Sequence, residues 1–170
     1  MNFCRRCGTT LRNIKDHVFQ CENDHILFAN NSPTAGIFLV NTRGHILMAI
    51  RGIEPYKGMI DIFGGFLDGN ETAEDAIARE LREELCLEPS EYSKPELLGS
   101  TTAIYPFKGE PIPLLGIHFY AHLLTDRQLT PTDDVADIYE AESIENIDFA
   151  QLSGDDIAVG LQRLKNILAK

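Results

Sequence analysis

Residues 65–87 read GFLDGNETAEDAIARELREELCL, a glycine-containing loop that runs into an acidic segment. The letters TAED at 72–75 have the form of a helix capping box, with Asp75 in the place usually taken by Glu. Pro89 follows the segment and cannot continue a helix. The apolar residues at helical spacing are Ile77, Leu81 and Leu85. The stretch therefore predicts a loop followed by a helix with one buried side.

The predicted helix gathers three carboxylates, Glu80, Glu83 and Glu84, within about 100° of arc on one face. Like charges at this spacing repel and weaken an isolated helix. Clustered carboxylate oxygens suit Mg²⁺ or Mn²⁺, and Mg²⁺ in turn suits phosphate chemistry. Taken alone, the segment is equally explained as a solvated charged face in which Arg79 pairs with Glu83.

The spacing of the whole stretch decides between these interpretations. Gly65 is followed after five residues by Glu71, and after seven more by the run RELREELCL at 79–87. This resembles the Nudix box, G-x5-E-x7-R-E-U-x-E-E-x-G-U, where U is a bulky aliphatic residue. Every fixed position matches except the last glycine, which is Cys86 here. The resemblance implies an α/β/α sandwich with a mixed β-sheet, and hydrolysis of nucleoside diphosphates linked to another moiety, with Mg²⁺ or Mn²⁺.

The resemblance also implies a role for each matching residue. The main-chain carbonyl of Gly65 and the carboxylates of Glu80, Glu83 and Glu84 would bind the divalent ion. Arg79 would orient a glutamate through a charge-assisted hydrogen bond, and Glu71 would brace the loop and helix. Glu83 is the first choice for the general base that accepts a proton from the attacking water.

In some members of the family the base comes instead from a downstream loop. The acidic stretch TDDVADIYEAE at 132–142 offers such residues. The rivals to Glu83 are Asp134, Asp137, Glu140 and Glu142. We expect at least three of these four to lie in a solvated acidic loop.

Cys86 departs from the family pattern at the helix terminus. The usual glycine ends the helix with positive φ, which cysteine tolerates poorly. We therefore expect the helix to end differently here, with Pro89 contributing, and Cys86 to be a small buried hydrophobic residue.

A second motif lies near the N-terminus, in the segment FCRRCGTTLRNIKDHVFQCENDH at 3–25. Cys4 and Cys7 have the C-x2-C spacing of a metal knuckle, and Cys21 adds a third thiol. His25 would complete a Cys3His zinc site, with Asp24 as the competing fourth ligand. A ribbon that has lost its metal and a redox pair are the alternatives, although the latter normally needs a βαβ context.

Hydrophobic patterning predicts the remaining elements. A hairpin is expected from strands at 35–40 and 45–50 joined by the turn NTRG, and a short strand at 59–63. Further strands are expected at 97–105 and 114–124, and a C-terminal helix after SGDD at 153–156. The predicted organisation is a zinc-ribbon-like segment at 1–30 and a Nudix domain at 31–170.

The layout resembles bacterial Nudix proteins with an N-terminal zinc ribbon, an arrangement shared by NADH pyrophosphatases. Their specificity motif, S-Q-P-W-P-F-P, should follow the box, but this chain has STTAIYPFKGEP at 100–111, without the Gln and Trp. NADH specificity is therefore not supported by this motif. Tyr105 or Phe107 is a candidate for stacking on a base, and Arg51 and Lys57 are candidates for phosphate contact. Packing and ordinary surface charge explain these residues equally well.

The composition limits the classes of partner and the location that we expect for this protein. The net charge is −11 and the pI about 4.8, which argues against extensive contact with nucleic acid or anionic membranes. No apolar run approaches a membrane span and the N-terminus lacks a signal-peptide core, so a cytoplasmic protein without disulfides is expected.

The predicted function is a pyrophosphohydrolase that cleaves a small nucleotide-derived substrate such as an ADP-sugar, a dinucleotide or a modified nucleoside triphosphate. The alternatives are a Nudix module that senses a nucleotide-sugar without turnover, and an NADH pyrophosphatase. Structural zinc is expected beside the catalytic Mg²⁺ or Mn²⁺. Many members of the family dimerise, so a homodimer is one expectation, and the sequence leaves the oligomeric state open.

Overall fold

The computed structural model describes residues 2–169, and its contacts divide the chain into two compact units, Met1–Asn31 and Ser32–Lys170. The contacts do not say what each unit does, so the predicted division into a zinc-ribbon-like segment and a Nudix domain remains a prediction. None of the helices in the described part of the chain is long and apolar enough to cross a membrane.

The first unit is a small antiparallel sheet in the order β1-β2-β3. Its strands are β1 (Leu11–Lys15), β2 (Val18–Cys21) and β3 (Ile26–Phe28). Only four buried residues form its core, and two of them are thiols: Cys4, Leu11, Cys21 and Leu27. A core this small gives little hydrophobic stabilisation, so a unit of this size normally needs a metal or disulfides.

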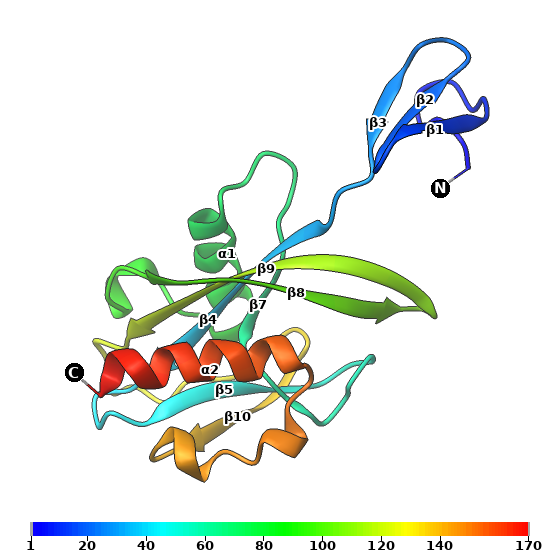
Figure 1. Ribbon diagram of the computed structural model, residues 1–170. Helices are drawn as coiled ribbons and strands as arrows, with labels where there is room; N and C mark the ends of the chain where they lie inside the picture. The colour runs from blue at the N-terminus through cyan, green and yellow to red at the C-terminus, as the bar shows by residue number, and fades with distance from the viewer. Residues whose placement is uncertain (1, 170) are drawn as a thin grey trace. The chain divides into compact units, whose positions relative to one another are not determined.

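The second unit is built on a mixed sheet in the order β10-β5-β4-β9-β8, with β6 paired to β5 and β7 to β4 (Figure 1). The strands are β4 (Ser32–Val40), β5 (Ile46–Arg51), β6 (Ile60–Asp61), β7 (Phe63–Phe66), β8 (Glu96–Phe107), β9 (Glu110–His122) and β10 (Val135–Ala141). Strands β4 and β9 run parallel, and the other pairs are antiparallel. The predicted hairpin at 35–50 is present, since β4 pairs antiparallel with β5.

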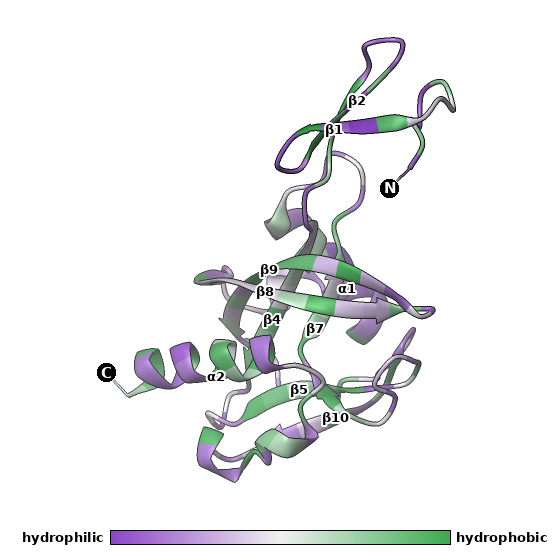
Figure 2. Ribbon diagram, turned by 45° about the vertical axis from the view of Figure 1, so that its right-hand side comes forward, coloured by the Kyte–Doolittle hydropathy of each residue, from purple (hydrophilic) through white to green (hydrophobic). Residues whose placement is uncertain are grey.

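Helix α1 (Ala73–Leu85) covers one face of this sheet and helix α2 (Asp155–Leu168) covers the other. One core packs α1 against residues such as Ile37 and Phe63, and the second packs α2 against Phe38 and Met48. Because both faces are covered, a central strand such as β5 is hydrophobic along most of its length (Figure 2). The α/β/α sandwich with a mixed sheet is therefore confirmed.

Helix α1 begins as the sequence predicts. The Thr72 hydroxyl accepts from the Asp75 amide at 3.2 Å and the Asp75 carboxylate accepts from the Thr72 amide at 3.4 Å, which completes the capping box. Three short 3₁₀ turns complete the second unit: Pro89–Glu91, Ile144–Asn146 and Phe149–Gln151.

The other end of α1 contradicts two expectations about Cys86. The helix ends in the left-handed way typical of glycine, because Cys86 itself adopts φ 51° and ψ 34°. The Leu87 amide then reaches back to the Leu81 carbonyl at 3.1 Å, and Arg127 Nη2 donates to the Cys86 carbonyl at 2.6 Å. Cys86 is also exposed rather than buried.

The acidic stretch at 132–142 is not a loop throughout. Residues Val135–Ala141 form the edge strand β10, which pairs with β5. Of the proposed rivals to Glu83, Asp137 and Glu140 lie on this strand and Glu142 follows it. Glu140 accepts from Arg43 Nη2 at 2.5 Å and from Asn41 Nδ2 at 2.8 Å, so its carboxylate serves a surface cluster. Only Asp134, just before the strand, lines a cavity.

Candidate active site

The glycine pair Gly64-Gly65 brings strand β7 unusually close to its neighbours. Gly64 has φ 133°, and a Cβ there would lie 2.1 Å from the Ala35 carbonyl oxygen on β4. A Cβ on Gly65 would lie 2.5 Å from Glu80 Oε1. Only glycine leaves room for the carboxylate of Glu80 to approach the backbone of the loop, which explains the two glycines at the start of the motif.

Arg79 joins the loop to the helix with all five of its N–H donors. Nε and Nη2 bind the two oxygens of Glu71, each at 3.0 Å, as a bidentate pair. Nη1 donates to Glu80 Oε1 at 2.7 Å and to Glu83 Oε2 at 3.0 Å, and Nη2 also reaches the Phe66 carbonyl at 3.0 Å. Glu71 further accepts from the Asp68 amide at 3.0 Å. These contacts place Glu71 in a bracing position and hold the carboxylates of Glu80 and Glu83 on one side of the helix.

Glu84 is the most deeply buried carboxylate on α1, with 3% of its surface exposed. Its Oε2 accepts from the Gly64 amide at 3.0 Å, and no arginine or lysine in the described chain forms an ion pair with it. Burial, reinforced by the nearby negative charges of Asp134 and Glu80, raises the pKa of Glu84 to about 10. The site thus holds more negative charge than its own cations can balance.

Glu80 lies in a similar environment but is less deeply buried than Glu84. Burial raises its pKa, while the ion pair with Arg79 acts in the opposite direction. Glu83 differs, since its side chain is 48% exposed and faces solvent beside Arg79. The oxygens of Gly65, Glu80, Glu83 and Glu84 are the hard ligands that Mg²⁺ and Mn²⁺ prefer, so their chemistry suits a divalent cation. Among the described residues these carboxylates do not converge as tightly as the Cys and His ligand atoms of the first unit, which lie within 4.8 Å of one another.

Asp134 reaches this centre from a different part of the chain. The turn that carries it is fastened to the end of α1, because the Thr132 amide donates to the Glu84 carbonyl at 2.8 Å. On the other side the Asp134 carbonyl accepts from the Gly52 amide at 2.6 Å. Asp134 and Glu84 line a small recess between the sheet and the helix, and the Asp134 charge raises the pKa of Glu84.

A cavity of about 620 Å³ opens beside these carboxylates. Gly64, Gly65 and Asp134 lie at its boundary, and Phe66 and Tyr105 form an aromatic wall with ring centroids 5.8 Å apart. Phe107 stacks on the far side of Tyr105 at 6.3 Å but does not line the cavity. The volume is in the range of small-molecule sites.

The two cations proposed from the sequence behave differently. Arg51 lines the cavity, donates from Nε to the Pro55 carbonyl at 2.7 Å and from Nη1 to Asp61 at 2.8 Å, and reaches the Tyr105 hydroxyl at 3.4 Å. Its charge is therefore already balanced by Asp61. Lys57 is exposed and is not part of the cavity wall.

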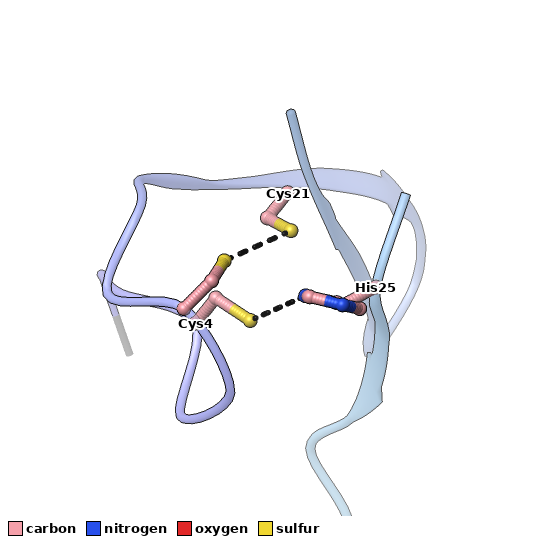
Figure 3. Close-up of side chains that lie close together, drawn as sticks. Cys4, Cys21 and His25 are labelled. Carbon is pink, nitrogen blue, oxygen red and sulfur yellow. Dashed lines mark hydrogen bonds between the residues drawn. The ribbon is translucent and has the colours of Figure 1, made fainter. Parts of the chain in front are cut away.

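The four ligands proposed for zinc come together in the first unit. The ligand atoms of Cys4, Cys7, Cys21 and His25 all lie within 4.8 Å of one another (Figure 3). Cys7 Sγ is 3.7 Å from Cys21 Sγ, and Cys4 Sγ is 3.6 Å from His25 Nδ1. A tetrahedral zinc ion with Zn–S of about 2.3 Å and Zn–N of about 2.0 Å has edges of about 3.8 and about 3.6 Å. The donor set and its spacing therefore fit zinc.

The competing ligand, Asp24, lies outside this group. It occupies a left-handed turn position with φ 58°, and its Oδ1 accepts from Gln20 Nε2 at 2.9 Å. Hydrogen bonds from Thr9 lower the pKa of Cys7 to about 5, so this thiol is readily available as the thiolate that binds metals.

Sequence reasoning missed three groups in the cavity wall: Asp61, His118 and Asp156. Burial raises the pKa of Asp61, against the opposing effect of Arg51. His118 is 2% exposed, and burial lowers its pKa to about 4. These residues come from separate strands and from the start of α2. The sequence shows His118 as a polar residue in an alternating strand. It does not show which residues the fold places beside His118.

The fold and the acidic centre together describe an α/β/α protein with several carboxylates beside a cavity of small-molecule size. The NUDIX domain family model matches residues 30–163. The chain therefore belongs to the Nudix family, which confirms the assignment made from the box.

Two named proteins match parts of this chain in sequence. The NAD-capped RNA hydrolase NudC of Pseudomonas syringae pv. tomato is 32% identical over 85 residues, 49% of this chain and 30% of that protein. The human mitochondrial NAD(P)H pyrophosphatase NUDT13 is 33% identical over 87 residues, 51% of this chain and 24% of that protein. The chain thus spans less than a third of the length of each of these relatives.

Solved structures share the fold. A NUDIX hydrolase from Nitrosomonas europaea matches with a TM-score of 0.69 at 23% identity, covering 99% of this chain and 91% of that one. A C. elegans Ap4A hydrolase matches with a TM-score of 0.66 at 18% identity, covering 81% of this chain and 98% of that one. At these identities the likeness concerns the fold alone.

Proposed function

We propose that this protein is a pyrophosphohydrolase that uses Mg²⁺ or Mn²⁺ to cleave the diphosphate of a nucleoside diphosphate derivative. The observation that carries the proposal is Glu84, a buried carboxylate without a cationic partner, next to Glu80 and a cavity of about 620 Å³. Buried charges are normally paired or bound to metal. A divalent ion would remove the imbalance and bring positive charge to a substrate diphosphate.

In this proposal the Gly65 carbonyl and the carboxylates of Glu80, Glu83 and Glu84 hold the ion. Bound there, the ion would balance charge on the diphosphate and lower the pKa of the attacking water. Arg79 fixes two of the glutamates through its Nη1 contacts at 2.7 and 3.0 Å. The chain's own contribution is thus a set of oxygens held in place before the ion and substrate arrive.

Glu83 is the proposed general base. It is the most exposed of the three glutamates, and Arg79 holds its Oε2 while the rest of the carboxylate faces solvent. Asp134 is the second candidate, because it lies beside Glu84 on the cavity wall. A general base contributes roughly 10²- to 10⁴-fold to the rate. We expect Glu83→Gln to lower kcat at least about 10²-fold while the fold survives.

The matched variant Asp134→Asn separates the two candidates. If Asp134→Asn lowers kcat by this amount and Glu83→Gln does not, the base is Asp134. Circular dichroism and thermal unfolding of both variants check that the fold is intact. Wild-type turnover in Glu83→Gln would refute the assignment of Glu83.

Three substrate classes were expected from the sequence: ADP-sugars, dinucleotides and modified nucleoside triphosphates. The names of the relatives NudC, NUDT13 and the Ap4A hydrolase all refer to compounds in which two nucleosides are joined through phosphates or to RNA that carries such a cap. These names support dinucleotides as the first class to test. They also support NADH as a candidate substrate, although the specificity motif of NADH pyrophosphatases is incomplete in this chain.

The decisive experiment is a substrate panel with Mg²⁺ or Mn²⁺, in which coupled phosphatase releases phosphate from newly formed monophosphate ends, and inorganic pyrophosphatase replaces the phosphatase for the nucleoside triphosphate. The panel contains ADP-ribose, NADH, Ap4A, an oxidised nucleoside triphosphate and NAD-capped RNA. Hydrolysis that requires the divalent ion supports the proposal. Tight binding of one compound without turnover of any would favour the alternative, a Nudix module that senses a nucleotide without cleaving it.

We further propose that the first unit binds one structural zinc ion through Cys4, Cys7, Cys21 and His25. The small buried core of this unit and the tetrahedral spacing of the four ligand atoms support the assignment. Metal analysis of the purified chain should give about one equivalent of zinc, the stoichiometry of one four-coordinate site. Less than half of that amount would refute it.

A further inference from the structure

The cavity beside the box extends to the start of helix α2, away from the carboxylates proposed to bind the metal. Its inner wall consists of Ser153–Ala158, which covers the loop before α2 and its first turn. Thr34, Gly36 and Leu114, from strands β4 and β9, form the adjoining wall. The loop is held in place because the Ser153 amide donates to the Ile60 carbonyl at 2.9 Å. This inner end contains the polar side chains of Asp156 and His118.

Asp156 places a carboxylate in this wall without a permanent cation. Its side chain is 16% exposed, and its basic neighbour is His118, whose Nε2 lies 3.9 Å from Oδ2. Asp61, the other carboxylate on this side of the cavity, is paired with Arg51 at 2.8 Å. Asp61 therefore has a cationic partner, whereas the Asp156 carboxylate is held by the backbone amides of Asp156 and Ile157 and keeps lone pairs for a further donor.

His118 stands next to Asp156 and is a neutral donor. Its ring is 2% exposed, and Nδ1 is the one buried side-chain nitrogen or oxygen among residues 2–169 that has no hydrogen-bond partner. Nδ1 faces α2 closely, since a Cβ on Gly160 would lie 2.7 Å from it. A proton on Nδ1 would be a buried donor without an acceptor, so the neutral ring carries its proton on Nε2. Nε2 lies 3.3 Å from the Thr101 hydroxyl.

The inner wall therefore offers an acceptor, Asp156, beside the buried ring of His118. Its complement is an N–H donor carried by a flat ring. The amino group of adenine and the carboxamide of nicotinamide both supply such a donor, whereas hypoxanthine and nicotinic acid place an oxygen at that position. The aromatic wall of Phe66 and Tyr105 completes a site shaped for a planar ring.

We infer that the inner end of the cavity recognises an amine-bearing ring of the substrate, and that Asp156 is the residue that determines this specificity. The inference rests on the proposed function only for the statement that the ligand is a nucleotide. Asp156 would accept a hydrogen bond from the amine, and the carboxylate would repel an oxygen at the same position. A site built around such a bond rejects analogues that cannot form it, because a buried polar group is then left unpaired.

Binding of mononucleotides tests the inference without requiring turnover. Isothermal titration calorimetry on the full chain with Mg²⁺ compares AMP with IMP, and nicotinamide mononucleotide with nicotinic acid mononucleotide. We expect one pair to show a preference of at least about 10-fold for the amine-bearing member, as for a hydrogen bond to a charged group. The pair that shows it identifies which ring occupies the inner end.

Asp156→Asn should bring this preference close to unity, because an amide can donate to the oxygen of the analogue. Glu145→Gln is the matched control, since it removes an exposed carboxylate that pairs with Lys165 of helix α2 at 2.6 Å and does not line the cavity. The control should keep the preference, whereas a mere effect on helix α2 would change both variants alike. Thermal unfolding confirms folding of each variant.

Equal affinity within both pairs, no binding of any of the four compounds, or equal effects of the two substitutions would overturn the inference. Failure of the substrate panel leaves this result standing, because binding is measured independently of hydrolysis. Conversely, hydrolysis without any preference between the paired compounds would retain the proposed function and reject the role of Asp156.

Discussion

Replacing Glu84 by glutamine should stabilise the protein in magnesium-free buffer while abolishing the proposed metal site. The pKa of Glu84 is raised to about 10 in the folded chain, whereas an exposed glutamate has a pKa near 4.5. Between these values the folded state holds one proton more than the unfolded state. Stability is therefore greatest at low pH and falls as the pH rises, until the folded group also loses its proton near pH 10.

The size of the effect follows from linkage. One extra bound proton in the folded state costs about 1.4 kcal/mol of unfolding free energy for each pH unit gained. From pH 6 to pH 8 the wild-type protein should lose up to about 3 kcal/mol through this group, a large share of the roughly 5–15 kcal/mol typical of a domain. Glutamine keeps the size and the hydrogen-bonding capacity of protonated Glu84 but does not titrate, so this part of the slope disappears.

Urea unfolding at several pH values, in buffer that lacks Mg²⁺ but leaves bound zinc in place, measures the difference. The chelator EDTA is omitted because it would strip zinc from the first unit. Glu83→Gln is the matched control for removing a carboxylate from the same helix, since Glu83 is half-exposed. Added Mg²⁺ should flatten the wild-type slope but not that of Glu84→Gln. Parallel slopes for the wild type and Glu84→Gln without Mg²⁺ would refute the reasoning.

Three further predictions test other parts of the structure. Arg79→Lys should lower kcat at least about 10-fold in the substrate panel, because lysine cannot form the bidentate contact or reach several oxygens at once. Unchanged kcat would show that the arginine network does not position the site. Cys86→Gly should raise the free energy of unfolding by about 1 kcal/mol in urea, since glycine adopts φ 51° without strain. A loss of stability would contradict this. Asp24→Asn should keep its zinc in metal analysis while Cys4→Ser loses it, and equal loss in both would return Asp24 to the ligand set.

The order of elements and the acidic centre were predictable because they depend on local spacing. The capping box at Thr72 and the apolar repeat of Ile77, Leu81 and Leu85 specify α1 within a short stretch, and the box glutamates follow from it. The Cys3His cluster was predictable for the same reason, although the choice between Asp24 and His25 needed the backbone. Left-handed geometry at Asp24 turns its carboxylate toward Gln20 and leaves His25 facing the thiols.

The inner end of the cavity was not predictable from spacing. In strand β9 the alternation of Phe119 and Ala121 with His118 and Tyr120 suggests one apolar and one polar face. Both sets are buried, because α1 covers one side of the sheet and α2 the other. A polar residue in such a strand becomes part of a buried wall, and its partners come from elements distant in sequence. The same holds for β10, whose alternation was hidden among acidic residues.

Asp61, Glu84 and Asp156 are largely shielded from solvent and differ in how their charge is balanced. Asp61 has Arg51 at 2.8 Å and needs no ligand. Glu84 has only a backbone amide and the repulsion of its neighbours, which is the condition that a divalent ion relieves. Asp156 faces a neutral histidine at 3.9 Å, which leaves it able to accept a donor from a ligand. Because an unbalanced buried charge is costly, the two carboxylates without a built-in cation point to what the cavity binds: a metal ion at one end and an amine-bearing ring at the other.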